Sequence, residues 1–449
     1  MKQLLSLALV LLALPTLVSV TTLSSCSSGG GGGGGIGVFV VQNTTHGVAT
    51  NTPVLVNERF LAYLASEGST GAGGTDMNGD MDILDSIVVV VNMVTGVTTN
   101  LGVAVASGLV AADTLAWTDT NITSTSLLYM VVSEADDMTD WNGDMDMTDL
   151  VLLSWTSGTG APVFVDEVSA GPGVKMIAME DKLFYTTPVV PTMALETNLN
   201  LVLGAAPVFP LPMFTNHAAV DGLSVHLIGQ DEGLISLYFD EALDGELNGD
   251  ADATDSSILG LLDGTAGAAG CVLSTSLAIA GPSGLPFRAS SLGASDWLVG
   301  FLVDEAAQGV NFNDPLHADL GGAGWAAPQC MGKEDADMTD GVLHWLDFSD
   351  FVADQVVGRA LNTGVVGEDR IAIVGNFLGT KSSEVDAGGC DLNDDMDFVD
   401  PIFRWVEAVS PPRPVTDMTK LLAIGDTPGG THGFAELSGR FVIVVDEAA

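Results

Sequence analysis

Oxygen-bearing side chains recur at a fixed spacing in four ten-residue windows, which begin at positions 76, 140, 246 and 391. Positions 1, 3, 5, 7 and 10 of each window carry a carboxylate or an amide oxygen. Side chains at this spacing can converge on one cation as the backbone turns around it, and Ca²⁺ prefers about six to eight oxygen ligands. The sequence therefore predicts four Ca²⁺ sites, with the ligands Asp76, Asn78, Asp80, Asp82, Asp85, Asp140, Asn142, Asp144, Asp146, Asp149, Glu246, Asn248, Asp250, Asp252, Asp255, Asp391, Asn393, Asp395, Asp397 and Asp400.

A fifth, degenerate window runs from Met331 to Asp340. It carries Met331 at position 1 and Lys333 at position 3, and it keeps only Asp335, Asp337 and Asp340 of the expected acids. A cation here would lose two ligands and face a lysine, so we expect little or no metal binding at this window.

The acidic residues are concentrated in these windows, since the five together hold 21 of the 58 Asp and Glu residues. Carboxylates packed this closely repel one another unless a cation neutralises them. The alternative is a set of solvated turns without metal.

The net charge of −45 would also repel nucleic acid and anionic lipid. We therefore exclude nucleic acid as a partner.

The windows resemble the calcium loops of dockerins, EF-hands and thrombospondin type 3 repeats. They depart from the EF-hand at position 6, which is Met or Ala in place of Gly, and at position 12, which is Ile87, Val151, Ser257 or Ile402. The last carboxylate stands at position 10 instead. The resemblance thus implies Ca²⁺ binding, but it does not carry over the helix-loop-helix geometry.

Apolar segments flank each acidic window and must position it. Segments such as Phe60–Ala65 precede the window and end near a Ser-Glu or Asp-Glu pair, and a second run such as Ile87–Val91 follows it. Short runs of β-branched residues bounded by Gly, Asn and Asp are typical of strands. The repeating unit is therefore strand, acidic loop, strand, tight turn (Thr95-Gly96 in the first unit) and strand, and the longest gap leaves room for a unit without an acidic loop around residues 182–212.

Six or seven such units predict an all-β protein, a β-propeller with long acidic loops between strands. The strand, Thr-Gly turn and strand element resembles blades of TolB-type propellers. The terminal strand, Arg440–Glu447, could complete a blade with N-terminal strands and so remove exposed sheet edges. The alternative architecture is an array of β-sandwich modules.

The N-terminus predicts export and a lipid anchor. Lys2 and the apolar run from Leu4 to Val20 are typical of a secretory signal peptide, predicted over residues 1–25. Leu23-Ser24-Ser25-Cys26 resembles the lipobox of bacterial lipoproteins, which implies lipidation of Cys26 and a location in the cell envelope, at an outer membrane or the cell surface. Residues 26–36 form a Gly/Ser-rich tether, and residues 37–449 form the repeat-built β domain.

No motif for enzymatic catalysis stands out. The six histidines lack zinc-type spacing, and Gly-x-Ser-x-Gly and phosphate-binding Gly-Lys loops are absent. The pairing among Cys271, Cys330 and Cys390 is left open. The leading hypothesis is a non-enzymatic binding or surface scaffold, tethered to a membrane, whose partner is a polysaccharide or an envelope protein. The alternatives are a propeller hydrolase or lyase acting on glycans, and dockerin-like interaction modules.

Overall fold

The computed structural model describes most of residues 44–443, and the longest gaps are 211–224, 313–337, 349–359 and 415–433. The predicted signal peptide, Cys26 and the tether lie outside the described residues, as do Cys271, Cys330 and Cys390. Among the residues that are described, no helix is long and apolar enough to cross a membrane.

In the described part of the chain, six four-stranded antiparallel sheets follow one another, and the strand order in each equals the sequence order. Sheets 1 to 3 comprise β1 (Leu55–Val56), β2 (Phe60–Ser66), β3 (Ser86–Asn92), β4 (Thr98–Ala104); β5 (Leu115–Thr120), β6 (Thr125–Ser133), β7 (Leu150–Thr156), β8 (Val163–Glu167); β9 (Ile177–Met179), β10 (Lys182–Pro188), β11 (Thr197–Leu203) and β12 (Ala206–Pro210). Sheets 4 to 6 comprise β13 (Val225–Asp231), β14 (Leu234–Phe239), β15 (Ile258–Asp263), β16 (Leu273–Ala278); β17 (Phe287–Gly293), β18 (Asp296–Asp304), β19 (Gly341–Asp347), β20 (Leu361–Val366); β21 (Ile371–Val374), β22 (Phe377–Ser383), β23 (Pro401–Glu407) and β24 (Arg413–Pro414).

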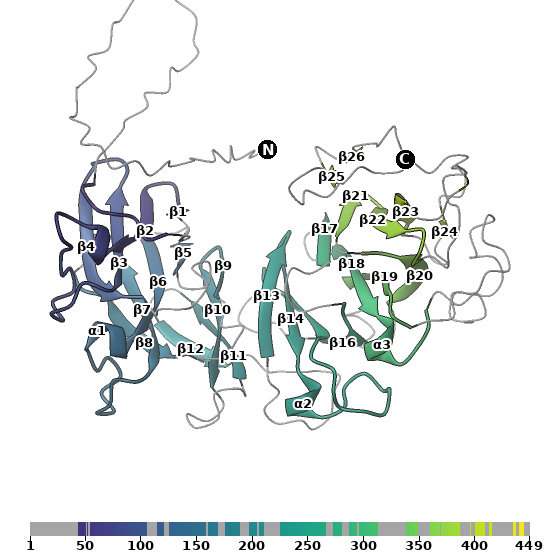
Figure 1. Ribbon diagram of the computed structural model, residues 1–449, viewed down its shortest axis with the longest axis horizontal. Helices are drawn as coiled ribbons and strands as arrows, with labels where there is room; N and C mark the ends of the chain where they lie inside the picture. Colours follow the sequence, from purple (N-terminus) through teal and green to yellow (C-terminus); the bar gives the residue numbers. More distant parts are fainter. Residues whose placement is uncertain are drawn as a thin grey trace, which may run out of the picture.

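Sheet 7 has two described strands, β25 (Phe434–Glu436) and β26 (Phe441–Ile443), which pair with each other. The short helical segments each follow the second strand of a sheet, and they are η1 (Glu67–Ser69), α1 (Glu134–Asp137), α2 (Glu241–Asp244) and α3 (Glu305–Gln308). Figure 1 shows the sheets following one another around the molecule, from sheet 1 in purple to sheets 6 and 7 in green and yellow.

The β-branched runs form the inner strands of each sheet. In β3 all five residues from Ile87 to Val91 are buried, so both faces of this strand are covered. Such a run forms a strand covered on both sides, because branched side chains pack well on a pleated surface. The predicted Thr95-Gly96 turn connects β3 to β4, and Gly96 adopts a positive φ of 73° and donates to the Asn92 carbonyl at 2.7 Å.

The sheets are arranged as the blades of a β-propeller. The first strand of each sheet packs against the first strand of the next, from β1 and β5 through to β21 and β25. Each neighbouring pair of sheets also shares an apolar cluster, such as the one that joins Phe60 and Val88 of sheet 1 to Leu128 and Trp155 of sheet 2. A sheet packed on both faces by its neighbours is the arrangement of a propeller and not of paired sandwiches.

The sequence predictions on architecture are therefore confirmed at the level of the all-β class and the propeller. Sheet 3 (β9 to β12) is the unit without an acidic loop that was predicted around residues 182–212. The alternative of separate sandwich modules is wrong, because every interior sheet contacts two neighbours. The pairing of the terminal strand with the N-terminal strands stays a prediction, since residues before 44 lie outside the described part.

Candidate metal centre

Each acidic loop connects the second strand of a sheet to the third. In sheets 1, 2 and 4 the second strand ends at Ser66, Ser133 or Phe239, one turn of helix follows, and the acidic loop then leads directly into the third strand. All the sheets repeat one strand order around the axis, so these connections emerge on the same face of the propeller. The helix-loop-helix of an EF-hand does not form here, in agreement with the sequence analysis.

The loop backbone is wound by side chains that accept hydrogen bonds from amides two to five residues further on. In the first loop the Asp76 carboxylate accepts from the amides of Gly79 and Met81 at 2.6 and 3.1 Å. Asp80 Oδ1 then accepts from the Asp82 amide at 2.9 Å. The second loop repeats these three contacts, at 2.6, 3.1 and 2.9 Å. Asp and Asn favour such turns because their short side chains reach their own backbone.

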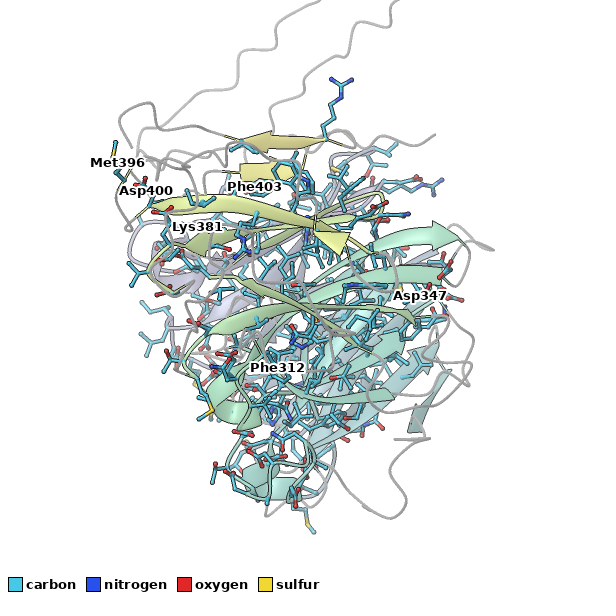
Figure 2. The ribbon with its side chains drawn as sticks, turned by 90° about the vertical axis from the view of Figure 1, so that its right-hand side faces the viewer. Phe312, Asp347, Lys381, Met396, Asp400 and Phe403 are labelled. Carbon is cyan, nitrogen blue, oxygen red and sulfur yellow. The ribbon has the colours of Figure 1, made fainter. Side chains whose placement is uncertain are left out.

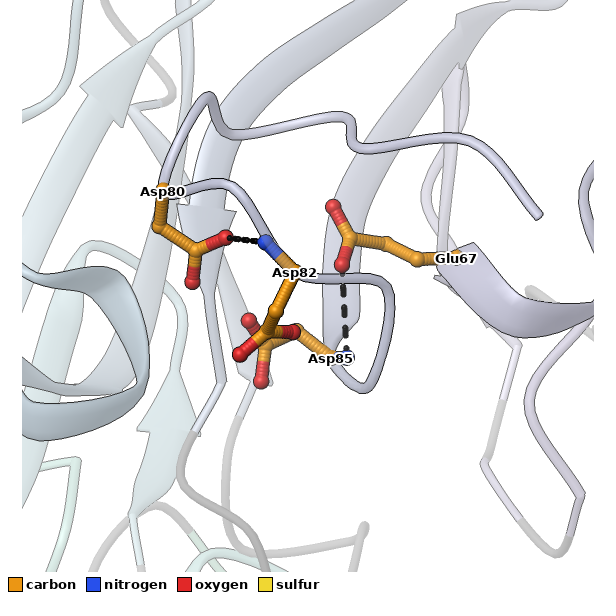
Figure 3. Close-up of side chains that lie close together, drawn as sticks. All are labelled: Glu67, Asp80, Asp82 and Asp85. Carbon is orange, nitrogen blue, oxygen red and sulfur yellow. Dashed lines mark hydrogen bonds between the residues drawn. The ribbon is translucent and has the colours of Figure 1, made fainter.

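Among the described residues, this winding brings acidic side chains together in three clusters, in each of which one oxygen per residue lies within 4.8 Å of the others. We call them the sheet-1, sheet-2 and sheet-4 clusters; their members are Glu67, Asp80, Asp82 and Asp85; Glu134, Asp146 and Asp149; and Glu241, Asp250, Asp252 and Asp255. Figure 3 shows the sheet-1 cluster, in which the four carboxylates approach one another from the loop and from η1. Such a group of hard oxygen ligands could hold a metal ion.

The structure divides the predicted ligands into two groups. Loop positions 7 and 10 enter the cluster in all three sheets, and position 5 enters in sheets 1 and 4. Position 1, which is Asp76, Asp140 or Glu246, is not among the clustered oxygens and accepts from loop amides instead. The position-3 asparagine donates its amide to the position-10 aspartate, at 3.0 Å for Asn142 and Asp149.

Each cluster also contains one glutamate that lies outside the ten-residue windows and was not predicted as a ligand. Glu67, Glu134 and Glu241 are the first residues of their helical turns, and their side chains are 0%, 0% and 1% exposed. Oε1 of Glu134 accepts from the amides of Trp141 and Asn142 at 2.6 and 3.2 Å. The Ser-Glu and Asp-Glu pairs at the strand ends were the sequence signal for these residues.

The second carboxylate oxygen of two of these glutamates has no hydrogen-bond partner. Oε2 of Glu134 and Oε2 of Glu241 are buried and unpartnered within the described part of the chain. A buried polar group without a hydrogen-bond partner destabilises the fold by about 1–3 kcal/mol, and a buried charged group without a partner destabilises it more. The cost vanishes if the oxygen coordinates a cation, so both orphaned atoms point to a metal.

Burial and then the neighbouring acidic side chains raise the pKa of Asp85 and of Asp255, each at position 10 of its loop. Burial, followed by the hydrogen bond with Asp80 and the charges of Asp82 and Glu67, raises the pKa of Asp85 to about 7. Burial and the neighbouring Glu241 charge raise the pKa of Asp255 to about 6. The two ion pairs described, Arg288 with Asp231 and Lys381 with Glu368, lie outside the clusters.

These pKa values predict that the metal-free protein loses stability as the pH rises. Asp85 binds its proton more tightly in the folded chain than in the unfolded chain, so its contribution is complete near pH 4 and is lost as the pH passes through about 7. We expect the melting temperature in chelator to be higher at about pH 5 than at about pH 8, and saturating Ca²⁺ to remove or reverse this order. Differential scanning calorimetry measures both. Asp85→Asn should weaken the pH dependence, and a pH dependence unchanged by Ca²⁺ would contradict the prediction.

Loop position 6 adopts a left-handed backbone although it carries no glycine. The φ angles are 81° at Met81, 79° at Met145 and 78° at Ala251. The methionine side chains project into solvent, with 92% of Met81 and 92% of Met145 exposed. The left-handed angle costs a non-glycine residue about 1–2 kcal/mol, so the surrounding turn must impose it.

The loop of sheet 6, predicted at Asp391, Asn393, Asp395, Asp397 and Asp400, lies mostly outside the described residues. Its described part matches sheet 1: Met396 has a φ of 80°, and the amide of the buried Glu384 donates to the Asp400 carbonyl at 3.0 Å. Figure 2 shows Met396 and Asp400 close together at one edge of the C-terminal sheet. In the degenerate window, Asp335 and Asp337 lie outside the described residues, whereas the Asp340 carbonyl accepts from the amide of Glu305 at 3.1 Å.

Comparison with known proteins adds little to this geometry. No family model and no curated protein matches the chain. Among solved structures, the polysaccharide lyase Uly1 is similar at 9% identity, over 89% of this chain and 85% of that one, with a TM-score of 0.33. The β-propeller domain of the Trilobed protease from Pyrococcus furiosus is similar at 9% identity, over 82% of this chain and 84% of that one, with a TM-score of 0.31. At these values the fold assignment rests on the strand order of the protein itself.

Proposed function

We propose that this protein is a membrane-tethered, extracytoplasmic β-propeller that uses several bound Ca²⁺ ions to hold its fold while it binds a partner. The observation that carries the metal proposal is the orphaned Oε2 of Glu134 and of Glu241, each buried without a hydrogen-bond partner on a glutamate whose carboxylate belongs to an acidic cluster. A solvated turn has no need to bury a carboxylate without a partner.

Ca²⁺ fits these clusters better than Mg²⁺ does. The ligands come from an irregular loop and a separate helical turn, and all of them are oxygen atoms. Ca²⁺ accepts flexible geometry and direct carboxylate ligation, whereas Mg²⁺ requires a near-octahedral shell and retains its waters. Sulfur and imidazole ligands, which softer metals prefer, do not occur among the clustered side chains described.

The binding role rests on the anchor and on the architecture. A lipid at Cys26 and a Gly/Ser tether would display the propeller at a membrane, where a polysaccharide or an envelope protein is the expected partner. A glycan-acting hydrolase or lyase remains the alternative hypothesis. The hypothesis of dockerin-like interaction modules is disfavoured, because the described loops lead directly into β3, β7 and β15 instead of a helix.

Metal analysis tests the metal proposal. We expect the purified protein to retain about four Ca²⁺ ions per chain after dialysis in inductively coupled plasma mass spectrometry. Asp80→Asn combined with Asp82→Asn should lower the count by one. The matched change at Asp335 and Asp337 in the degenerate window should leave it unchanged. A protein without bound Ca²⁺ that takes up none from millimolar solution would reduce the clusters to solvated turns.

The anchor has its own test. Replacing Cys26 with Ser should abolish membrane attachment without changing the melting temperature of the propeller, because the residue precedes the folded domain. Metabolic labelling with a palmitate analogue and fractionation of the cells measure attachment. Equal label in the wild type and in Cys26→Ser would refute lipidation at this position.

A further inference from the structure

The acidic loop of sheet 1 lies against the helical turn of sheet 2. Asn78, at loop position 3, donates its side-chain amide to the Asp136 carbonyl at 3.5 Å. The same helical turn, α1, holds the end of β4, because Asp137 Oδ1 accepts from the Ala104 amide at 2.9 Å. α1 is therefore anchored on sheet 1, both at the acidic loop and at the outer strand.

α1 also builds the cluster of its own sheet. Its first residue is Glu134, whose carboxylate belongs to the sheet-2 cluster. Its last residue, Asp137, is only 6% exposed and uses its second oxygen, Oδ2, to accept from the Trp141 indole at 2.7 Å. Trp141 lies at position 2 of the sheet-2 loop. One carboxylate thus joins the edge of sheet 1 to the loop that surrounds the next cluster.

We propose that the metal sites of sheets 1 and 2 bind cooperatively, with α1 as the connecting element. This inference rests on the proposed function of the clusters as metal sites. Metal at the sheet-1 cluster fixes Asn78, which positions α1, and α1 presents Glu134 to the second ion in the correct place. Binding of the first ion already orders α1, so binding of the second ion carries a smaller loss of conformational entropy.

The sheet-4 cluster provides a contrast within the same chain. Its Asn248 donates to the Ala307 carbonyl of α3 at 2.9 Å, so the contact to the next sheet is repeated. In α3, however, the amide of Glu305 donates to the Asp340 carbonyl of the degenerate window at 3.1 Å, and this window is expected to bind little or no metal. On the other side, the sequence of sheet 3 contains no acidic loop, so we expect the sheet-4 site to bind independently.

Terbium luminescence measures the sheet-2 site separately from the others. Tb³⁺ occupies Ca²⁺ sites and emits when a nearby tryptophan is excited, and Trp141 is the tryptophan in the sheet-2 loop. Titration of the full chain with Tb³⁺ should give sensitised emission, and Trp141→Phe should remove most of it. This control assigns the signal to sheet 2.

Disabling the sheet-1 site with Asp80→Asn and Asp82→Asn should weaken Tb³⁺ binding at sheet 2 by about tenfold. The matched pair Asp250→Asn and Asp252→Asn, which removes the same charge from sheet 4, should leave the midpoint unchanged. Because coupling is reciprocal, Glu134→Gln should weaken the sheet-1 site by a similar factor.

Asn78→Asp separates the contact from the charge and guards against a variant that fails to fold. It keeps an oxygen ligand at sheet 1 but cannot donate to the Asp136 carbonyl. The added charge alone would strengthen binding at sheet 2, whereas loss of the α1 contact should weaken it. Absence of sensitised emission in the wild type would refute the metal sites themselves. Normal emission with a midpoint that neither Asn78→Asp nor the sheet-1 pair weakens would refute the coupling alone.

Discussion

Removing Ca²⁺ with a chelator should lower the melting temperature by about 10 °C. A ligand that binds only the folded state stabilises it by about 2.7 kcal/mol per site at a hundredfold excess over the dissociation constant. Three described clusters would together contribute roughly 8 kcal/mol to the free energy of unfolding. For a domain of this size, that contribution corresponds to a shift of about 10 °C in melting temperature. Differential scanning calorimetry with and without chelator measures the shift.

The identity of the ion decides how the effect is reversed. Millimolar Ca²⁺ should restore the melting temperature fully, Mg²⁺ should restore it poorly, and sodium chloride at matched ionic strength should not substitute. If sodium chloride restored the melting temperature as well as Ca²⁺ does, general screening of the −45 net charge would explain the acids instead.

Glu134→Gln should have opposite effects with and without metal. In Ca²⁺ the neutral amide oxygen is a much weaker ligand than the carboxylate, so the variant should lose the ion at this site and about 2–3 kcal/mol of stability. In chelator the amide still accepts from the Trp141 amide, and its NH₂ group can donate to Asp146 or Asp149. The uncompensated buried charge disappears, so the variant should be about 1 kcal/mol more stable than the wild type.

Urea denaturation in the two conditions measures this reversal. Glu241→Gln should repeat it in sheet 4, where Oε1 accepts from the Leu247 amide at 2.5 Å and Oε2 is also unpartnered. Glu58→Gln, at a residue of the β1–β2 connection outside the clusters, serves as the matched control and should change little in either condition. Destabilisation by Glu134→Gln of equal size with and without Ca²⁺ would show that the glutamate has a purely structural role.

The repeat allowed much of the fold to be predicted from the sequence. The runs of β-branched residues beside each acidic window identify the inner strands. The spacing of the windows indicates six or seven sheets and leaves room for one without a loop. The ligand set was harder to predict. Asp76 has the residue type and spacing of a ligand, yet its carboxylate is used by the amides of Gly79 and Met81.

The buried glutamates show the complementary difficulty. Glu134 stands six residues before Asp140, outside the ten-residue window, and only the folding of one helical turn at the end of β6 returns its carboxylate to the loop. Spacing along the chain predicts ligands that a single turn can gather. It does not predict ligands that lie outside the loop and reach the cluster only because a strand end and a helical turn place them there.

The methionines at the loop tips have a consequence for oxidative damage. Their thioethers lie in solvent and away from the apolar clusters, so peroxide reaches Met81 and Met145 before it reaches buried sulfur such as that of Met130. Conversion to the sulfoxide adds a polar oxygen where water already surrounds the side chain, and it leaves the packing between the sheets intact. These residues can therefore consume oxidant at the surface of the propeller at little cost to its fold.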